Sequence, residues 1–115
     1  MPRVFDDKEL LERIDHDWEF LTETVEMLSR DGRARLAEVD RALGAADAAA
    51  VAGAAHALKG MISNFCSPVT QAAALEVEQI AKSADLSGAS KAVKVLQNQL
   101  ETLIAELTEF VATRA

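Results

Sequence analysis

The stretch Ala54-Ala55-His56-Ala57-Leu58-Lys59-Gly60-Met61-Ile62-Ser63-Asn64-Phe65 has the apolar pattern of a helix with two unlike faces. An α-helix turns by about 100° per residue, so one face can be read around His56. Within about 60° of it lie small or polar residues, namely Ala52, Gly53, Lys59, Gly60 and Ser63. Roughly the opposite third is apolar and comprises Val51, Ala54, Ala55, Leu58, Met61, Ile62 and Phe65. The pattern predicts a helix beginning near Asp47 that buries its apolar face and directs His56 away from the core.

Two glycines stand beside His56 on this face, Gly53 and Gly60. A glycine inside a helix costs about 1 kcal/mol relative to alanine, so a fold gains nothing from placing two there. Glycines of this kind allow another backbone to come close. An ordinary surface histidine remains the alternative, but it leaves the bare patch and the neighbouring Lys59 unexplained.

The sequence after this stretch predicts two further helices. Ser67-Pro68 is typical of an N-cap followed by proline at the first helical position, and that helix is expected to run to about Ala84. A loop is expected over 85–90. The last helix carries the most regular apolar stripe of the chain, which consists of Val93, Leu96, Leu100, Leu103, Leu107 and Phe110.

The sequence before it predicts a charged helix over 6–14 and two amphipathic helices. The first of these has apolar residues at helical spacing, namely Ile14, Trp18, Leu21, Val25 and Leu28. Asp31-Gly32 then predicts a turn or stop. The second carries Leu36, Val39 and Leu43, and Gly44 is expected to end it. Asp47 is the expected N-cap of the central helix.

Four substantial amphipathic helices with short links predict an all-α fold, an antiparallel four-helix bundle with a short additional N-terminal helix. The 115 residues suit a single domain, residues 1–115, and half of them are apolar. Alanine and leucine dominate, and tyrosine is absent. No internal repeat is evident.

Charge and composition exclude several classes of function. The net charge of −7, without a basic stripe, argues against nucleic-acid binding. No apolar run approaches the length of a membrane span, and the first eight residues show no signal-peptide pattern. The single cysteine, Cys66, permits no internal disulfide and suits a reducing compartment. We therefore expect a cytoplasmic protein in which Cys66 is a small buried residue.

The segment His56-Ala57-Leu58-Lys59-Gly60 resembles the H-x-L-K-G signature of histidine-containing phosphotransfer (HPt) domains. Ala55 before it and Asn64-Phe65 after it agree with the flanks of that pattern. The later segment from Leu75 to Leu86 resembles the family's next helix, with an acid or amide followed four residues on by a base. The resemblance covers nearly the whole chain.

This resemblance implies that His56 is the phosphoacceptor, supported by Gly60 in the motif. Glu78 would accept a hydrogen bond from Nδ1–H of His56 and leave Nε2 as the nucleophile, with Lys82 as the associated base. Lys59 and Lys82 would favour the added phosphate. A solvated surface role for Glu78 and Lys82 stays open. The small face, Ala52, Gly53 and Ser63, would let a partner dock.

The chain shows no independent catalytic machinery, because it lacks a Gly-rich phosphate loop, a kinase signature and an acidic trio for Mg²⁺. The resemblance thus implies a phosphoryl carrier, not an enzyme, with no bound cofactor or metal. Response-regulator receiver domains, or a hybrid sensor histidine kinase, would be the partners and would supply Mg²⁺ and the aspartate. We expect a monomer. A helical interaction module without phosphorylation is the alternative.

The chain departs from the HPt pattern at three positions. Met61 and Ile62 stand where small residues are usual, and both fall on the apolar side of the helix. Cys66 replaces a glycine common ten residues after the histidine, which leaves the end of the central helix in doubt.

Two rival assignments are weaker. Sensor-kinase dimerisation domains also present a helical histidine, but they resemble one another in an acid directly after it and a proline soon after. Here Ala57 follows His56, and the next proline is Pro68. His16 shares a helix face with Glu12 at i, i+4, yet a di-metal site in a bundle needs a second such pair. We expect His16 to be a solvated surface residue.

Overall fold

A computed structural model describes residues 3–114 of the chain. All regular elements of these residues are helical. In order they are α1 (Asp7–Arg13), α2 (Trp18–Met27), the π-helix η1 (Leu28–Gly32), α3 (Arg33–Gly44), α4 (Ala48–Ile62), the 3₁₀ turn η2 (Ser63–Phe65), α5 (Pro68–Lys82), the 3₁₀ turn η3 (Leu86–Gly88) and α6 (Ala89–Ala112). None of the helices in this part of the chain is both long and apolar enough to cross a membrane.

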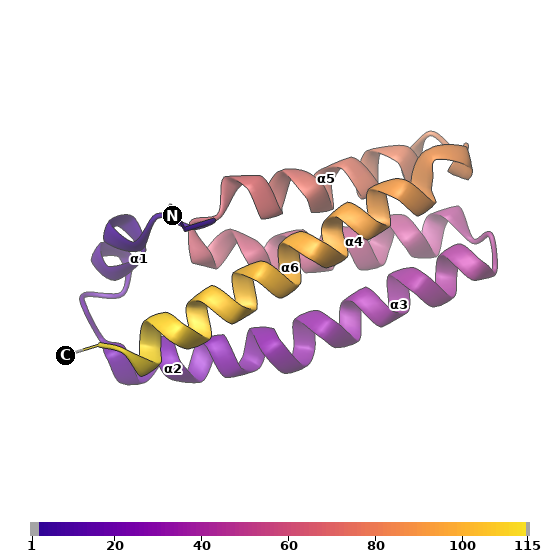
Figure 1. The fold of residues 1–115 in the computed structure, drawn as a ribbon. Helices are drawn as coiled ribbons and strands as arrows, with labels where there is room; N and C mark the ends of the chain where they lie inside the picture. Colours follow the sequence, from indigo (N-terminus) through magenta and orange to yellow (C-terminus); the bar gives the residue numbers. More distant parts are fainter. Residues whose placement is uncertain (1–2, 115) are drawn as a thin grey trace.

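The helices form an antiparallel four-helix bundle, which confirms the predicted fold. α2, η1 and α3 follow one another as a single long rod, and α4, α5 and α6 lie beside it (Figure 1). α4 packs between α3 and α5, and α5 packs against α6. The short helix α1 lies at the end of the bundle where α4 finishes (Figure 1).

The core consists of the apolar stripes that the sequence predicts. The central helix buries five residues, namely Val51, Ala54, Ala55, Leu58 and Ile62. The last helix buries Val93, Leu96, Leu100, Leu103 and Leu107 among others. Burying such side chains is the main stabilising term of a bundle, and here it fixes the orientation of α4 about its own axis. The opposite face of α4 is left at the surface.

Aspartate caps begin three of the helices. Asp47 accepts a hydrogen bond from the backbone N–H of Ala50 (3.1 Å), as predicted, and Asp6 and Asp17 act in the same way for α1 and α2. Pro68 is the first residue of α5. Ser67 does not cap this helix with its side chain, because its hydroxyl instead lies 2.6 Å from the carbonyl oxygen of Val4.

The predicted stop at Asp31-Gly32 is wrong, because the chain continues through it as a π-helix. Gly32 has ordinary helical angles, φ −64° and ψ −44°. A Cβ there would lie 3.2 Å from Cδ1 of Leu28 and 3.8 Å from Cδ1 of Leu58. An added Cβ would therefore crowd the side chain of Leu28, one turn earlier in the same rod, and would make only ordinary contact with Leu58 of α4.

Left-handed residues also differ from the sequence expectation. α3 ends at Gly44, as predicted, but Gly44 has an ordinary φ, and the left-handed residue that follows is Ala46, at φ 54°. The first apolar stripe is likewise interrupted, because Asp15 and His16 are left-handed and Ile14 falls outside α2. Cys66 is buried at φ 56°, which explains why glycine would suit this position.

The N-terminal segment ties α1 to the end of α4. The backbone N–H of Asp6 donates to the carbonyl oxygen of Cys66 (2.9 Å). Arg13 donates to the carbonyl oxygen of Ser63 (3.0 Å), which satisfies a free acceptor beyond α4. Phe5 packs edge-on against Phe110 of α6. The helix that carries His56 is thus tied to the N-terminal segment at its C-terminal end.

Candidate functional site

The side chain of His56 projects from the middle of α4 and is 67% exposed. Its Nδ1 lies 2.8 Å from Oε2 of Glu78 on α5. The burial of Leu58 and Ile62 turns the opposite side of the helix outward, so the imidazole stands at the seam between α4 and α5. The sequence pattern predicted this outward position.

Glu78 is the buried member of the site, with only 3% of its side chain exposed. Lys59 of α4 donates to Oε1 of Glu78 (2.8 Å), and Nζ of Lys82 lies 3.0 Å from Oε2. Lys59 first, and then Lys82, lowers the pKa of the Glu78 carboxyl to about 2 against the opposing effect of burial. His56 adds to the lowering. The carboxylate therefore stays ionised over the physiological range.

Helical geometry explains how these groups meet. His56 and Lys59 are three residues apart on α4, and Glu78 and Lys82 are four apart on α5, so each pair shares one face of its helix. Because α4 and α5 pack together, the two faces adjoin. The carboxylate thereby receives donors from both helices.

The geometry selects one tautomer of the imidazole. An ionised carboxylate can only accept hydrogen bonds, so Nδ1 of His56 carries the proton that points at Glu78. Nε2 then keeps its lone pair and is the nitrogen available to an incoming group. A neutral imidazole held in this way is a nucleophile whose developing positive charge faces a fixed negative charge.

The structure brings together four of the residues singled out from the sequence, namely His56, Lys59, Glu78 and Lys82. A solvated surface position for Glu78, which the sequence left open, is wrong because the side chain is buried. Lys82 is an exposed residue that pairs with Glu78.

The small residues line the same face. Gly53 and Gly60 are exposed, and a Cβ at either position would meet nothing within 4 Å. Ala52 is half-buried, and the hydroxyl of Ser63 donates to the carbonyl oxygen of Gly60 (2.6 Å). The bundle itself has no need of glycine at 53 or 60, in contrast to Gly32.

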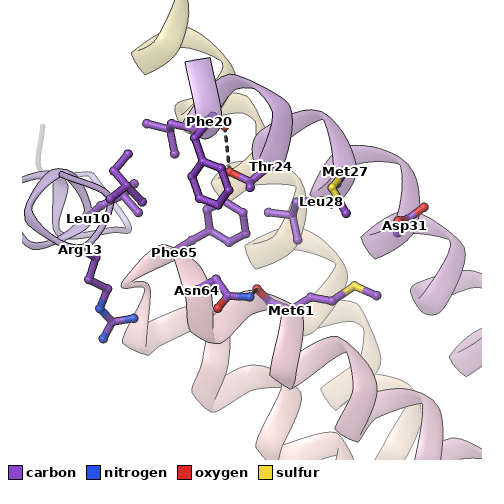
Figure 2. Close-up of a pocket in the computed structure, with 12 residues that line it drawn as sticks. Leu10, Arg13, Phe20, Thr24, Met27, Leu28, Asp31, Met61, Asn64 and Phe65 are labelled. Atoms are coloured by element: carbon purple, nitrogen blue, oxygen red, sulfur yellow. Dashed lines mark hydrogen bonds between the residues drawn. The ribbon is translucent and has the colours of Figure 1, made fainter. Parts of the chain in front are cut away.

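Sequence analysis missed a groove between α1, α2 and the end of α4. Figure 2 shows it with Phe20 and Met27 on one wall and Met61 and Asn64 on the other. Its volume is about 420 Å³, and Phe20 and Met27 are each about half exposed, at 50% and 51%. Met61 was assigned to the apolar core, but it is only half-buried and lines this groove. The available signal was that Phe20 and Met27 lie outside the predicted apolar stripe.

His16 lies outside this site. It is exposed, as expected. It is left-handed at φ 59°, in the turn after α1, so the predicted helix face shared with Glu12 is wrong. Within residues 3–114, no three His, Cys, Asp or Glu side chains gather in a way that could hold a metal ion. Cys66 is buried, and burial raises the pKa of its thiol.

Comparison with known proteins gives a consistent result. A family model described as "Hpt domain" matches residues 23–107. Among solved structures, the histidine-containing phosphotransfer protein B (HptB) from Pseudomonas aeruginosa PAO1 superimposes with a TM-score of 0.90 over 100% of both chains, at 20% sequence identity. At this identity the structural match shows a shared fold. A search of curated proteins found no significant match to the chain.

Proposed function

The chain belongs to the Hpt domain family, and we propose that it carries a phosphoryl group on His56 within a multistep phosphorelay. It would accept the group from the aspartyl phosphate of one receiver domain and pass it to the aspartate of another. One observation supports this assignment above all. The imidazole is exposed and its Nδ1 is held by a buried carboxylate, which leaves Nε2 as the ring nitrogen for the reaction.

The transfer step follows from that arrangement. The lone pair on Nε2 attacks phosphorus, an N–P bond forms, and the bond between phosphorus and the aspartyl oxygen breaks with its electron pair. The receiver's aspartate leaves as a carboxylate. Nδ1 keeps its proton throughout, so the ring becomes positively charged opposite Glu78, which stabilises that charge. The reverse step restores the neutral ring.

The chain would not carry out this step alone. The site holds a nucleophile, His56, and a carboxylate that orients it, Glu78. The phosphoryl group that His56 attacks would come from the partner. We propose that the receiver supplies both the aspartate and the Mg²⁺ that neutralises the phosphoryl oxygens. The protein would then act as a carrier and bind no cofactor of its own.

The docking face would be the side of α4 that carries His56. Gly53 and Gly60 leave open space where the loops around a receiver's aspartate must approach, and Ala52 and Ser63 complete this face. The groove at Phe20, Met27 and Met61 lies beyond it toward α1. Apolar side chains exposed beside a polar site are typical of protein interfaces. A receiver docked over His56 would cover both this face of α4 and the groove.

The test is phosphotransfer from a phosphorylated receiver to the purified chain in the presence of Mg²⁺, with His56→Gln in parallel. We expect a phosphoryl adduct on the wild type that is stable in base and labile in acid, and none on the variant. Intact mass and acid–base stability identify the adduct. A small phosphoramidate donor provides a second route to the same product.

If neither a panel of receivers nor the small donor labels His56 in the folded chain, the carrier assignment is wrong. The bundle would then be a helical interaction module. Labelling that survives His56→Gln would place the phosphoryl group on another residue and would equally refute the assignment. Circular dichroism of both proteins verifies that the fold is intact.

A further inference from the structure

The groove between α1, α2 and the end of α4 contains two of the chain's three methionines, Met27 and Met61. Figure 2 shows their side chains on opposite walls, Met27 from α2 and Met61 from α4. We propose that Met27 is a modification site, at which a peroxide oxidises the thioether to the sulfoxide and thereby weakens the docking of a receiver. The modification itself concerns this chain alone, and its effect on docking rests on the proposed function.

Three residues with sulfur lie within the described residues 3–114, and they differ in exposure. Met27 is 51% exposed, whereas Met61 is half-buried and packs against the core. Cys66 is only 8% exposed, and because burial raises the pKa of its thiol, little of the reactive thiolate is present. Oxidation of sulfur follows its access to the oxidant and, for cysteine, the thiolate fraction. Among these three residues, Met27 is therefore the one that a peroxide reaches most readily.

The reaction at Met27 is a two-electron oxidation. A lone pair on the thioether sulfur attacks one oxygen of hydrogen peroxide, an S–O bond forms, and the O–O bond breaks. The departing hydroxide takes up the proton that the attacked oxygen loses, so the products are methionine sulfoxide and water. The sulfur is oxidised and the peroxide is reduced. Methionine sulfoxide reductases reverse the change, so the modification can act as a switch.

Oxidation places a strongly polar group in a mainly apolar groove, and the polar neighbours on the same wall have no hydrogen to offer it. The hydroxyl of Thr24 already donates to the carbonyl oxygen of Leu21 (2.9 Å). Asp31 accepts a hydrogen bond from Arg30 (3.0 Å) and, as a carboxylate, has none to donate. A polar group that loses water without gaining a hydrogen bond opposes burial. The sulfoxide therefore disfavours an apolar contact at this wall.

The groove is continuous with the face of α4 that carries the reacting ring. His56, Gly60 and Asn64 are exposed and follow one another at i, i+4 and i+8, so Asn64 lies about 12 Å along the chain axis from His56. Asn64 and Met61 form one wall of the groove, and Met27 lies on the other. A receiver domain docked over His56 spans this distance, and it is the occupant on which the switch acts.

The modification is tested by treating the full chain with hydrogen peroxide and locating the added oxygen by peptide mass spectrometry. We expect Met27 to be oxidised several-fold faster than Met61, and before Cys66 reacts. In urea, where exposure no longer differs, the two methionines should react at similar rates. Oxidation of Met61 as fast as Met27 in the folded chain, or earlier oxidation of Cys66, would overturn the assignment of the site.

The effect on docking is tested by transfer from a phosphorylated receiver to the full chain. Oxidation at Met27 should raise the KM for the receiver about tenfold, because an interface anchor is lost, while labelling of His56 by the small phosphoramidate donor stays unchanged. Methionine sulfoxide reductases of both stereospecificities should restore the KM. Met27→Gln, which places a polar side chain of similar length in the groove, should raise the KM without peroxide.

Two leucine variants identify the sulfur that is responsible. Each variant is compared with its own untreated form, so a change in its basal KM does not enter the comparison. The KM of Met27→Leu should not respond to peroxide, whereas that of Met61→Leu should respond as the wild type does. An unchanged KM in a chain fully oxidised at Met27, or a response that persists in Met27→Leu, would overturn the switch.

Two further measurements separate the switch from other causes. The urea midpoint should be the same before and after oxidation at Met27, because an exposed residue outside the core contributes little to stability. A destabilised bundle would attribute the loss of transfer to unfolding and would overturn the effect on docking. If neither receivers nor the small donor label the untreated chain, the proposed function is refuted, while the oxidation of Met27 found by mass spectrometry stands.

Discussion

At the scale of single residues, Glu78 is the group on which the site depends. It is a buried carboxylate with three donors, and its partners come from two helices. Burying a charge is expensive unless it is paired. Removing a lysine therefore destabilises the buried, ionised carboxylate of Glu78 more than it disturbs the surrounding surface. The resemblance to HPt domains predicted the His56–Glu78 pair. It did not predict that both lysines bind Glu78 in the unphosphorylated protein.

The low pKa of Glu78 predicts a specific dependence of stability on pH. Its folded pKa is about 2 against a usual value near 4.5, so its ionisation stabilises the fold fully above pH 4.5. That contribution is lost as pH falls toward 2, because the folded state binds the proton later than the unfolded state. Glu78→Gln removes this contribution, so the stability difference between wild type and variant should shrink between pH 5 and pH 2.5.

Urea unfolding of both proteins across this range is the measurement. The other carboxylates titrate in both proteins and cancel in the difference. A stability gap that stays constant with pH would contradict the ionised, paired state of Glu78.

At the scale of elements, α4 has two unlike faces. One face packs in the core, and the opposite face, which carries His56, makes no core contacts. Gly32 and Gly53 illustrate the contrast. A Cβ on Gly32 would press on Leu28, whereas a Cβ on Gly53 would meet nothing. Both are glycines inside helical segments, and nothing in the local sequence pattern distinguishes them. Only the packing of the side chains around each glycine in the folded chain does.

The open space at Gly53 and Gly60 predicts that alanine at either position affects stability and transfer in opposite directions. Gly53→Ala and Gly60→Ala should each raise the free energy of unfolding by up to ~1 kcal/mol, while slowing transfer from a receiver because the added methyl faces the partner. Gly44→Ala, equally open but on α3 away from His56, is the control and should leave transfer unchanged. Denaturant unfolding and receiver-dependent transfer rates measure the two effects. Variants at 53 and 60 that transfer at the wild-type rate would show that no close approach occurs there.

Element boundaries show where sequence reasoning holds. The aspartate cap at Asp47 and the proline at Pro68 were predicted correctly because both depend on local geometry. The stop at Asp31-Gly32 was predicted wrongly because glycine permits a turn without requiring one, and Gly32 keeps ordinary helical angles. The left-handed residue after α3 was missed because the fold imposes that conformation on alanine.

At the scale of the whole molecule, the bundle fold and the exposed imidazole could be predicted, but the groove at Phe20 could not. The stripes on the helices determine which faces are buried, and this suffices for a four-helix bundle. The groove depends on where α1 lies against α2 and α4, and its placement rests on contacts such as Arg13 to Ser63 and Asp6 to Cys66. These join residues fifty or more positions apart in the sequence, which periodicity cannot reveal.

The groove predicts that receivers are recognised by apolar contact at a distance from the reacting ring. Phe20→Ser and Met27→Ser should each raise the KM for a phosphorylated receiver about tenfold, because a buried interface anchor is lost. Val95→Ser on α6 is the matched control, since Val95 is exposed to a similar extent, 47%, on another helix. Steady-state transfer kinetics with each variant provide the measurement, with labelling by the small donor as the reference for an intact site. An equal effect of all three variants would exclude the groove as a docking surface.

The imidazole of His56 can be reached from one side, because Glu78 and α5 close the other. On the proposed function, a donating and an accepting receiver must occupy that side in turn and never together. Throughput is then governed by how quickly the first receiver departs. Two signalling branches that share this domain would compete for it whenever free carrier is scarce, even if their regulators never touch.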